Sequence, residues 1–209
     1  MFITLEGSDG SGKSSQHTLL VDFLKAQGYP VLATREPGGT PIGEQVRLIL
    51  SDLKNTAMHP RSEILLFQAS RAQLVEEVIR PHLASGGVVV CDRYADSTIA
   101  YQGYGYQLVP LDLLASIVSF ATGGLKPDLT LLLDMDVKEG LQRRMRGGDW
   151  NRLDAYDLEF YERVRQGYLE MASAEPDRWT IIDAGQMPDQ VHASICAVVM
   201  ERLQRRQTA

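Results

Sequence analysis

The sequence has little of several features that mark particular classes of protein. Its two cysteines, Cys91 and Cys196, lie far apart and outside any C-x-x-C pattern, so neither a disulfide framework nor a zinc site is expected. No apolar run approaches the roughly 20 residues that a membrane-spanning helix needs. Met1 leads directly into a predicted strand that carries Glu6, which argues against a secretory signal. We therefore expect a cytoplasmic protein without a membrane partner.

Positive charge is also scarce. The chain has 21 Lys and Arg residues against 27 Asp and Glu residues, a formal net charge of -6. Proteins that bind nucleic acid polymers normally present a basic surface, so such a partner is not expected. A small anionic ligand in a local basic pocket remains compatible. The length of 209 residues and the hydrophobic content of 44% predict a single domain over residues 1–209.

Short apolar runs alternate with segments of helical spacing along the whole chain. The runs cover residues 2–5, 31–34, 87–91, 129–133 and 179–182. This alternation predicts an α/β fold, in which a five-stranded parallel sheet has helices on both faces. Ligands of such sheets bind at the carboxyl ends of the strands. Polar residues gather at these ends in this sequence, so we expect the functional site there.

The predicted helices include one long helix at 61–85, bent or ended near Pro81, and two more at 96–106 and 111–122. A basic helix at 138–146 and an acidic and aromatic helix at 156–174 flank a glycine pair. Glycines with arginines nearby suit a segment that closes over phosphates, so we predict a mobile lid at about 143–155. The tail at 201–206 is expected to be a solvated helix end.

Residues 7–14 fit the pattern G-x-x-x-x-G-K-[ST] between a predicted strand and a predicted helix, the context that this P-loop pattern requires. The glycines let backbone N–H groups turn inward, and the helix adds the positive end of its dipole. Lys13 supplies a cation, and Ser14 supplies a hydroxyl for Mg²⁺. The expected phosphate-binding residues are Gly7, Ser8, Asp9, Gly10, Ser11, Gly12, Lys13, Ser14 and Ser15.

Other residues suit phosphoryl transfer, which depends mainly on positioning and positive charge. Asp92 ends a buried strand and can hold Mg²⁺ through water, while Arg93 after it can hold phosphate. The predicted lid carries further cations at Arg143, Arg144, Arg146 and Arg152.

Two helical spacings suggest a second ligand. Phe67 and Arg71 are four residues apart and share a helix face, and Thr98, Tyr101 and Gln102 do so on the helix after Asp92. A planar heterocycle could stack on Phe67 and bond to Arg71, with Thr98 and Gln102 along its edge.

Several motifs together resemble the bacterial thymidylate kinases, which are P-loop nucleoside monophosphate kinases. Beside the glycine loop, the most specific are Arg-Glu-Pro-Gly-Gly-Thr at 35–40, Asp-Arg-Tyr at 92–94 and Ala-Tyr-Gln-Gly at 100–103. The resemblance runs almost end to end and also covers 4–7, 67–72, 127–130 and 151–154. It implies transfer of the ATP γ-phosphoryl group to dTMP with Mg²⁺, giving dTDP and ADP for dTTP synthesis. It also implies a homodimer, built through helices such as the one containing Phe67.

The resemblance assigns roles to individual residues. Residues of the glycine loop would hold ATP, Asp9 would also reach the sugar 3′-hydroxyl of dTMP, and Ser14 with Asp92 would serve the metal. Tyr101 would crowd C2′ and disfavour ribonucleotides, and Arg71 would bond to thymine O4. The implied dTMP-binding residues are Asp9, Glu36, Pro37, Arg47, Phe67, Arg71, Arg93, Thr98, Tyr101 and Gln102, with Arg35 nearby.

The implied catalytic residues are Lys13, Arg93, Arg143 and Arg152. Positions 8–11 contain no arginine, so a lid arginine must stabilise the transferring charge, with Arg143 as first choice and Arg152 as second. One departure is that many relatives place an arginine shortly after Gly103, whereas this chain has Tyr104-Gly105-Tyr106-Gln107. The alternatives are a kinase for another nucleotide or a deoxynucleoside and, in a different class, a regulatory nucleotide switch. The guanine-reading pattern N/T-K-x-D of many switches is absent.

Overall fold

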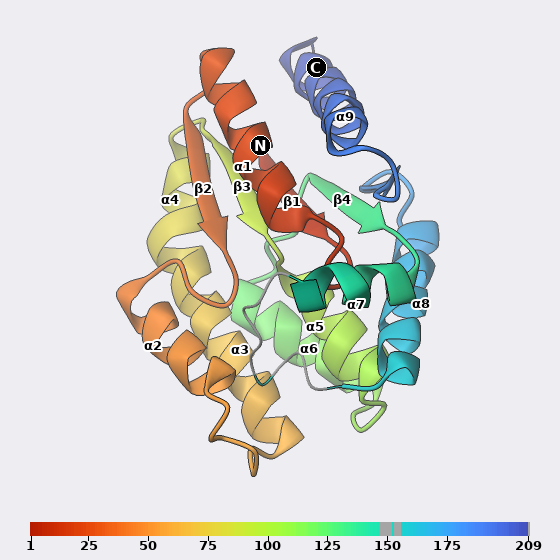
Figure 1. Cartoon of the computed structure of the whole chain (residues 1–209). Helices are drawn as coiled ribbons and strands as arrows, with labels where there is room; N and C mark the ends of the chain where they lie inside the picture. The colour runs from red at the N-terminus through yellow and green to blue at the C-terminus, as the bar shows by residue number, and fades with distance from the viewer. Residues whose placement is uncertain (147–151, 153–155, 209) are drawn as a thin grey trace.

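The computed structural model describes residues 1–146, 152 and 156–208, and its architecture is a sheet between two layers of helices (Figure 1). All five strands are parallel and are ordered β2-β3-β1-β4-β5. Their bounds are β1 Phe2–Glu6, β2 Val31–Arg35, β3 Val88–Asp92, β4 Leu129–Asp134 and β5 Trp179–Asp183. The predicted five-stranded parallel sheet is confirmed.

Helices connect the strands, and two segments of them are π-helical. Their bounds are α1 Lys13–Ala26, α2 Pro41–Ser51, α3 Pro60–Leu74, η1 Val75–Ile79 (π), α4 Arg80–Ala84, α5 Ala95–Thr98, η2 Ile99–Gly105 (π), α6 Leu111–Thr122, α7 Val137–Arg146, α8 Leu158–Ala174 and α9 Pro188–Thr208. Among these described residues, no helix has the length and hydropathy that crossing a membrane requires.

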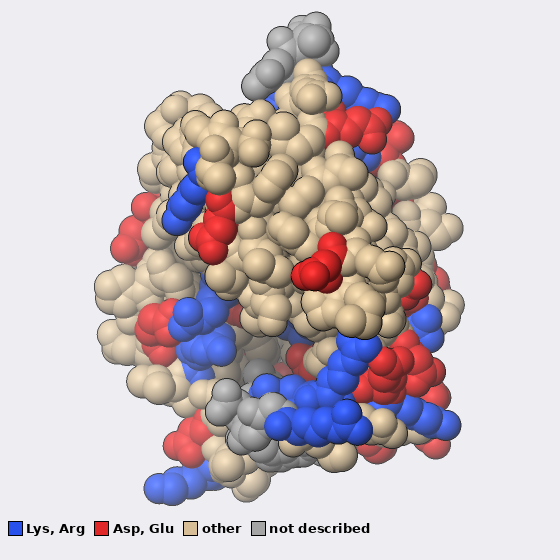
Figure 2. Space-filling view, turned by 45° about the horizontal axis from the view of Figure 1, so that its top comes forward, with Lys and Arg blue, Asp and Glu red and all other residues tan. Residues whose placement is uncertain are grey.

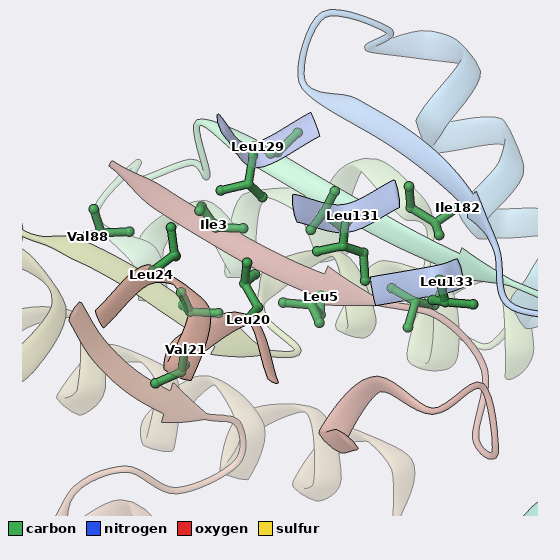
Figure 3. Packing of buried hydrophobic residues seen from close by; sticks show 14 of the residues in the cluster. Ile3, Leu5, Leu20, Val21, Leu24, Val88, Leu129, Leu131, Leu133 and Ile182 are labelled. Carbon is green, nitrogen blue, oxygen red and sulfur yellow. The ribbon is translucent and has the colours of Figure 1, made fainter. Parts of the chain in front are cut away.

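The core consists of apolar side chains on both faces of the sheet. Figure 3 shows Ile3, Leu5 and Leu131 of the central strands beside Leu20 and Leu24 of α1. The same cluster continues into α9. On the other face, one cluster joins the sheet to α8 and another joins it to α3 and η1. The three central strands, β1, β3 and β4, therefore read as nearly continuous apolar runs because both of their faces are covered.

The long predicted helix at 61–85 is a continuous succession of α3, η1 and α4. Pro81 is the second residue of α4, and because it has no N–H it removes one backbone hydrogen bond from this continuous helix. The π-helical turn immediately before it changes the hydrogen-bond pattern. The predicted long helix is therefore confirmed, but it runs through Pro81 and ends at Ala84; a bend at Pro81 stays a prediction.

The sequence interpretation omitted α2 and described the chain end incompletely. Thr40 caps α2 by accepting a hydrogen bond from the Gly43 N–H at 2.9 Å, and Pro41 follows at the first helical position. At the chain end, Leu203 of α9 is only 5% exposed and belongs to the core. Arg206 forms an ion pair with Asp128 at 2.8 Å. The tail is thus a docked helix and not merely a solvated one.

The predicted lid lies mostly outside the described residues. Residues 143–146 form the end of α7, and residue 152 is described, whereas 147–151 and 153–155 are not. The mobility of this segment stays a prediction.

Leu131 lies at the centre of the sheet and is fully buried. We expect Leu131→Ala to lower the free energy of unfolding by about 2–5 kcal/mol, because the substitution removes apolar contacts and leaves a cavity. The change is measured by urea denaturation. The control is Leu19→Ala, because Leu19 is 41% exposed on α1, and its effect should stay within about 0.5 kcal/mol. Equal effects of the two substitutions would contradict this account of the core.

Candidate functional site

The glycine loop lies where the direction of strand connections reverses. It follows β1, which pairs with β3 on one side and β4 on the other, and such a reversal creates a crevice at the carboxyl ends of the strands. Gly10 has a φ of 81°, and a Cβ added there would lie 1.9 Å from the carbonyl oxygen of Gly140 in α7. The loop can therefore pack against α7 only with glycine at this position.

Lys13 spans the loop from the first residue of α1. Its Nζ donates hydrogen bonds to the Ser8 carbonyl oxygen at 2.8 Å and to Ser11 Oγ at 3.4 Å. Burial and the positive charge of Arg93 lower the pKa of Lys13 to about 8. An anion bound in the loop would favour the charged form, so Lys13 suits a phosphate ligand.

Ser14 and Asp92 meet across the loop, 78 residues apart in the sequence. Ser14 Oγ donates a hydrogen bond to Asp92 Oδ2 at 2.7 Å. Within the described residues, no group of three or more His, Cys, Asp or Glu side chains could hold a metal. The Ser14 and Asp92 oxygens nevertheless fit Mg²⁺, which is commonly bound by one or two carboxylates together with substrate phosphates.

Arg93 adopts a left-handed backbone conformation with a φ of 70°, which is unusual for a residue other than glycine. Its Nη2 donates to Asp9 Oδ1 at 2.6 Å and to the Tyr101 hydroxyl at 3.0 Å. Burial would raise the pKa of Asp9, but the charges of Arg93 and Lys13 outweigh it and lower this pKa. Such strained residues concentrate at functional sites.

Glu6 supports Arg93 from below the loop, through two shared hydroxyl groups. Its carboxylate is fully buried and accepts hydrogen bonds from the Tyr94 N–H at 2.8 Å, Ser97 Oγ at 2.6 Å and the Tyr168 hydroxyl at 3.0 Å. Arg93 Nη1 donates to the same Ser97 and Tyr168 oxygens, at 3.1 and 3.2 Å. Burial, with the nearby charge of Asp96, raises the pKa of Glu6 to about 7.

Arg71 forms the floor of the predicted acceptor pocket and is 1% exposed. Its Nε and Nη2 donate to Glu36 Oε2 at 2.8 and 2.6 Å, and Nη2 also donates to the Tyr94 carbonyl oxygen at 3.0 Å. Its Nη1 donates to Gln68 Oε1 at 2.6 Å and to Thr98 Oγ1 at 2.9 Å. These bonds engage all five guanidinium N–H groups, so a ligand carbonyl would have to replace one of them.

Glu36 contributes an unused acceptor to this pocket. Its Oε1 is buried and has no hydrogen-bond partner, and burial raises the pKa of this carboxyl despite the charge of Arg71. A buried oxygen without a partner is costly in a folded protein. It suits a ligand that brings a hydroxyl or an N–H group.

These groups line one continuous cavity of about 450 Å³. Figure 2 shows Lys and Arg side chains gathered around a hollow on this face of the molecule. The predicted site residues among its lining are Asp9, Gly10, Gly12, Lys13, Ser14, Ser15, Glu36, Pro37, Arg47, Phe67, Arg71, Asp92, Arg93, Thr98, Tyr101, Gln102 and Arg143. Gly7, Ser8, Ser11 and Arg152 are described but are not part of this lining.

The predicted lid arginines face different partners. Arg143 lines the cavity, donates to the Ala184 carbonyl oxygen at 3.2 Å and pairs with Glu139. Arg152 instead pairs with the buried Glu63 of α3 at 2.6 Å. Arg144, which was not among the predicted site residues, also lines the cavity.

The remaining predicted cations lie near the β2 end of the cavity. Arg47 Nη1 donates to the Pro37 carbonyl oxygen at 2.9 Å, and Arg35 forms an exposed ion pair with Glu44 at 3.0 Å. Both arginines line the cavity.

Comparison with known proteins agrees with this geometry. The family model described as thymidylate kinase matches residues 5–195. The chain belongs to the thymidylate kinase family. A thymidylate kinase from Roseiflexus sp. (strain RS-1) is 51% identical over 211 residues, which cover 95% of this chain and 93% of that protein. One from Deinococcus radiodurans is 52% identical over 202 residues, which cover 97% of both chains.

A solved structure supports the family fold as well. The crystal structure of thymidylate kinase from Ehrlichia chaffeensis matches with a TM-score of 0.79 and 36% sequence identity, and the match covers 95% of this chain and 98% of that chain. The predicted resemblance to thymidylate kinases and the predicted P-loop kinase fold are both confirmed.

Sequence reasoning missed several residues that this member of the thymidylate kinase family uses to build its site. Glu6 and Tyr168 are 162 positions apart, and no local spacing connects them. Ser97 and Glu63 were missed for the same reason. The one available signal was Glu6 itself, since a charged residue at the end of an otherwise apolar strand needs a buried partner.

The raised pKa of Glu6 predicts a pH-dependent stability. The folded chain holds this proton up to about pH 7, whereas the ordinary pKa of a solvent-exposed Glu is 4.5. Between these pH values the folded state binds more protons than the unfolded state, so the carboxyl destabilises the fold as pH rises. Relative to Glu6→Gln, the wild-type protein should lose on the order of 2–3 kcal/mol of stability from pH 4.5 to pH 7.

The measurement is urea denaturation of both proteins at several pH values. Glu170→Gln is the control, because Glu170 is an exposed residue of α8 and should give no such loss. A difference between wild type and Glu6→Gln that stays constant over this pH range would refute the buried, protonated Glu6.

Proposed function

We propose that this chain transfers the γ-phosphoryl group of ATP to dTMP, giving dTDP and ADP in dTTP synthesis. The observation that carries the proposal is the single cavity that joins the glycine loop to a second pocket around Phe67, Arg71 and Gln102. A nucleotide switch does not need a second pocket. The family to which the chain belongs supports dTMP as the acceptor.

The donor side holds phosphates through backbone groups and Lys13. Residues 7–15 bind the ATP phosphates, and Lys13 exchanges its bond to the Ser8 carbonyl oxygen for a phosphate oxygen. Ser14 and Asp92 would hold Mg²⁺, which when bound would neutralise charge on the phosphates. The free-energy cost of moving the charged phosphates out of water is thereby offset at several points of the loop.

The acceptor side combines a cation for phosphate with a polar base pocket. Arg93 binds the dTMP phosphate, with Arg47 and Arg35 nearby, and Asp9 meets the sugar 3′-hydroxyl. Support comes from Arg93 being held between Asp9 and Tyr101 at the centre of the cavity. Glu36, whose Oε1 has no partner, and Pro37 complete this wall.

The base is held by side chains deeper in the same cavity. Phe67 stacks on thymine and Arg71 donates a hydrogen bond to its O4. Thr98 and Gln102 lie along the remaining edge of the base. Tyr101 occupies the space beside C2′, so a ribose hydroxyl is disfavoured. Support comes from the burial of Arg71 and Thr98, each 1% exposed, since buried side chains are held in place before the base arrives.

The chemistry needs no protein nucleophile. An oxygen of the dTMP phosphate attacks the γ-phosphorus of ATP, and the bond from that phosphorus to the bridging oxygen of ADP breaks. Lys13, Arg93 and Arg143 stabilise the charge on the transferring group. Arg143 is preferred over Arg152 because Arg143 lines the cavity, whereas Arg152 is paired with Glu63.

A substrate panel tests this function. ADP release is measured with dTMP, dUMP, UMP, dCMP or thymidine as acceptor, and dTMP should give the highest kcat/KM. Lys13→Met should lower kcat about 10²–10³-fold with dTMP, because it removes one positive charge from the transferring group. Negligible turnover of dTMP beside good turnover of another acceptor would show that dTMP is not the substrate. ATP hydrolysis that is independent of every acceptor would favour a nucleotide switch.

We also propose that the chain forms a homodimer through α2, α3 and α6. Helix α3 contacts both α2 and α6, and large apolar side chains on these three helices are exposed. They include Leu48 (70%), Ile49 (46%), Leu65 (59%), Leu113 (51%) and Phe120 (87%). Clustered exposure of this kind is typical of surfaces that another protein covers.

Phe120→Glu should convert the dimer to a monomer, because the partner would have to bury an unpaired charge. The measurement is sedimentation equilibrium. The matched control is Met187→Glu, since Met187 is 68% exposed but precedes α9, outside the proposed interface. A wild-type monomer, or a Phe120→Glu dimer as stable as the wild type, would contradict the proposed interface.

We further propose a cytoplasmic location. Cys91 and Cys196 are both free, and Cys91 is buried. Unpaired cysteines are typical of reducing compartments.

A further inference from the structure

The Glu63 carboxylate joins three parts of the chain at the far end of the acceptor pocket. Glu63 lies in the first turn of α3 and is fully buried. Its Oε1 accepts hydrogen bonds from Gln102 Nε2 at 3.0 Å and from the Tyr106 hydroxyl at 2.8 Å. Its Oε2 accepts one from Arg152 Nη2 at 2.6 Å. The cavity lining includes Gln102 but not Glu63, so Glu63 acts behind the pocket wall.

Arg152 and Tyr106 hold this carboxylate in place. The Arg152 side chain is 12% exposed, so the ion pair is largely removed from water, and it supplies the counter-charge that a buried carboxylate requires. The Tyr106 hydroxyl occupies the second lone pair of Oε1 and also contacts the Tyr156 hydroxyl.

A carboxylate can only accept hydrogen bonds, whereas a glutamine amide has one end that donates and one that accepts. The Gln102 amide must therefore turn its Nε2 toward Glu63. Its Oε1 is then directed away from Glu63, and among the described residues none donates a hydrogen bond to it. Because Gln102 lines the cavity beside Phe67 and Arg71, this oxygen is the acceptor that remains for a ligand.

We propose that Glu63 is a positioning residue that determines base selectivity by fixing the orientation of the Gln102 amide. The fixed amide presents a carbonyl oxygen to the base edge. It therefore favours a base whose ring nitrogen carries a hydrogen, as N3 of thymine does, over one whose ring nitrogen is an acceptor, as N3 of cytosine is. This inference rests on the proposed function, because it takes a pyrimidine monophosphate as the ligand of the pocket.

The experiment compares binding of dTMP and dCMP to wild type, Glu63→Gln and Tyr106→Phe by isothermal titration calorimetry without ATP. The glutamine of Glu63→Gln can donate to Gln102 Oε1 as readily as it can accept from Nε2, so the orientation of Gln102 is no longer fixed. The ratio of the dCMP Kd to the dTMP Kd should fall about tenfold in this variant, as expected for one oriented hydrogen bond.

Tyr106→Phe is the matched control. It removes another hydrogen bond to the same Glu63 oxygen but leaves the contact between Glu63 and Gln102 intact. Its Kd ratio should stay within about twofold of the wild-type ratio, since the amide orientation does not change. A fall in the Tyr106→Phe ratio as large as that of Glu63→Gln would overturn the proposal. Base selectivity would then be lost whenever any hydrogen bond to Glu63 is removed, and not through the orientation of the Gln102 amide.

A merely structural role for Glu63 gives a different result. Both nucleotides would then bind more weakly by the same factor, and an unchanged Kd ratio in folded Glu63→Gln would overturn the proposal.

Glu63→Met is a second variant, because it removes the acceptor without burying a new polar group, and it should lower the ratio in the same way. A wild type that does not prefer dTMP would instead refute the proposed function itself.

Discussion

The site depends on how one buried carboxylate is satisfied at the end of the central strand. Glu6 ends β1 immediately before the glycine loop and has no access to water. A buried charge without partners would cost several kcal/mol, and here a backbone N–H after β3 and hydroxyls on α5 and α8 supply the partners. These bonds attach α5 and α8 to the sheet directly beneath Arg93. The position of Arg93 is therefore a consequence of where Glu6 must find its hydrogen bonds.

The same principle recurs in and beside the cavity, where three arginines with side chains less than one-fifth exposed are each held by an acid before any ligand is present. Arg93 pairs with Asp9, Arg71 with Glu36, and Arg152 with Glu63. Pairing fixes each guanidinium in one geometry, which lowers the ordering cost when a ligand binds. It also means that a ligand must exchange with an existing partner. The preference for a ligand is then set by the small difference in free energy between the hydrogen bonds that the arginine makes with its protein partner and those that it makes with the ligand. Such a balance favours selectivity.

Local sequence patterns predicted the sheet and the position of the glycine loop. Apolar runs locate every strand, and they are most nearly continuous in β1, β3 and β4, which are buried along almost their whole length. The glycine spacing locates the loop, and the ends of β1 and β3 bring Ser14 within 2.7 Å of Asp92 as expected. These features follow from a few neighbouring residues together with the topology of a parallel sheet.

The polar contacts between distant helices could not be predicted in the same way. The partner of Arg152 is Glu63, 89 positions earlier, and the sequence alone placed Arg152 only in a lid. Arg71 was expected to offer a donor to the base, yet its five N–H groups are already engaged by Glu36, Gln68, Thr98 and Tyr94. Pairings of this kind depend on how each helix is rotated about its own axis. Hydrophobic periodicity shows which face of a helix is buried, but it does not fix the rotation closely enough to pair individual polar side chains.

The two halves of the cavity use different physical means of recognition, and this difference has a consequence for selectivity. In the proposed function, the donor half relies on backbone N–H groups and Lys13, which would bind any polyphosphate and carry no information about a base. The acceptor half relies on oriented side chains such as Arg71 and Gln102, whose donors and acceptors have fixed places. Discrimination between bases is therefore expected mainly in the acceptor half, where a wrong base would be carried directly into the product.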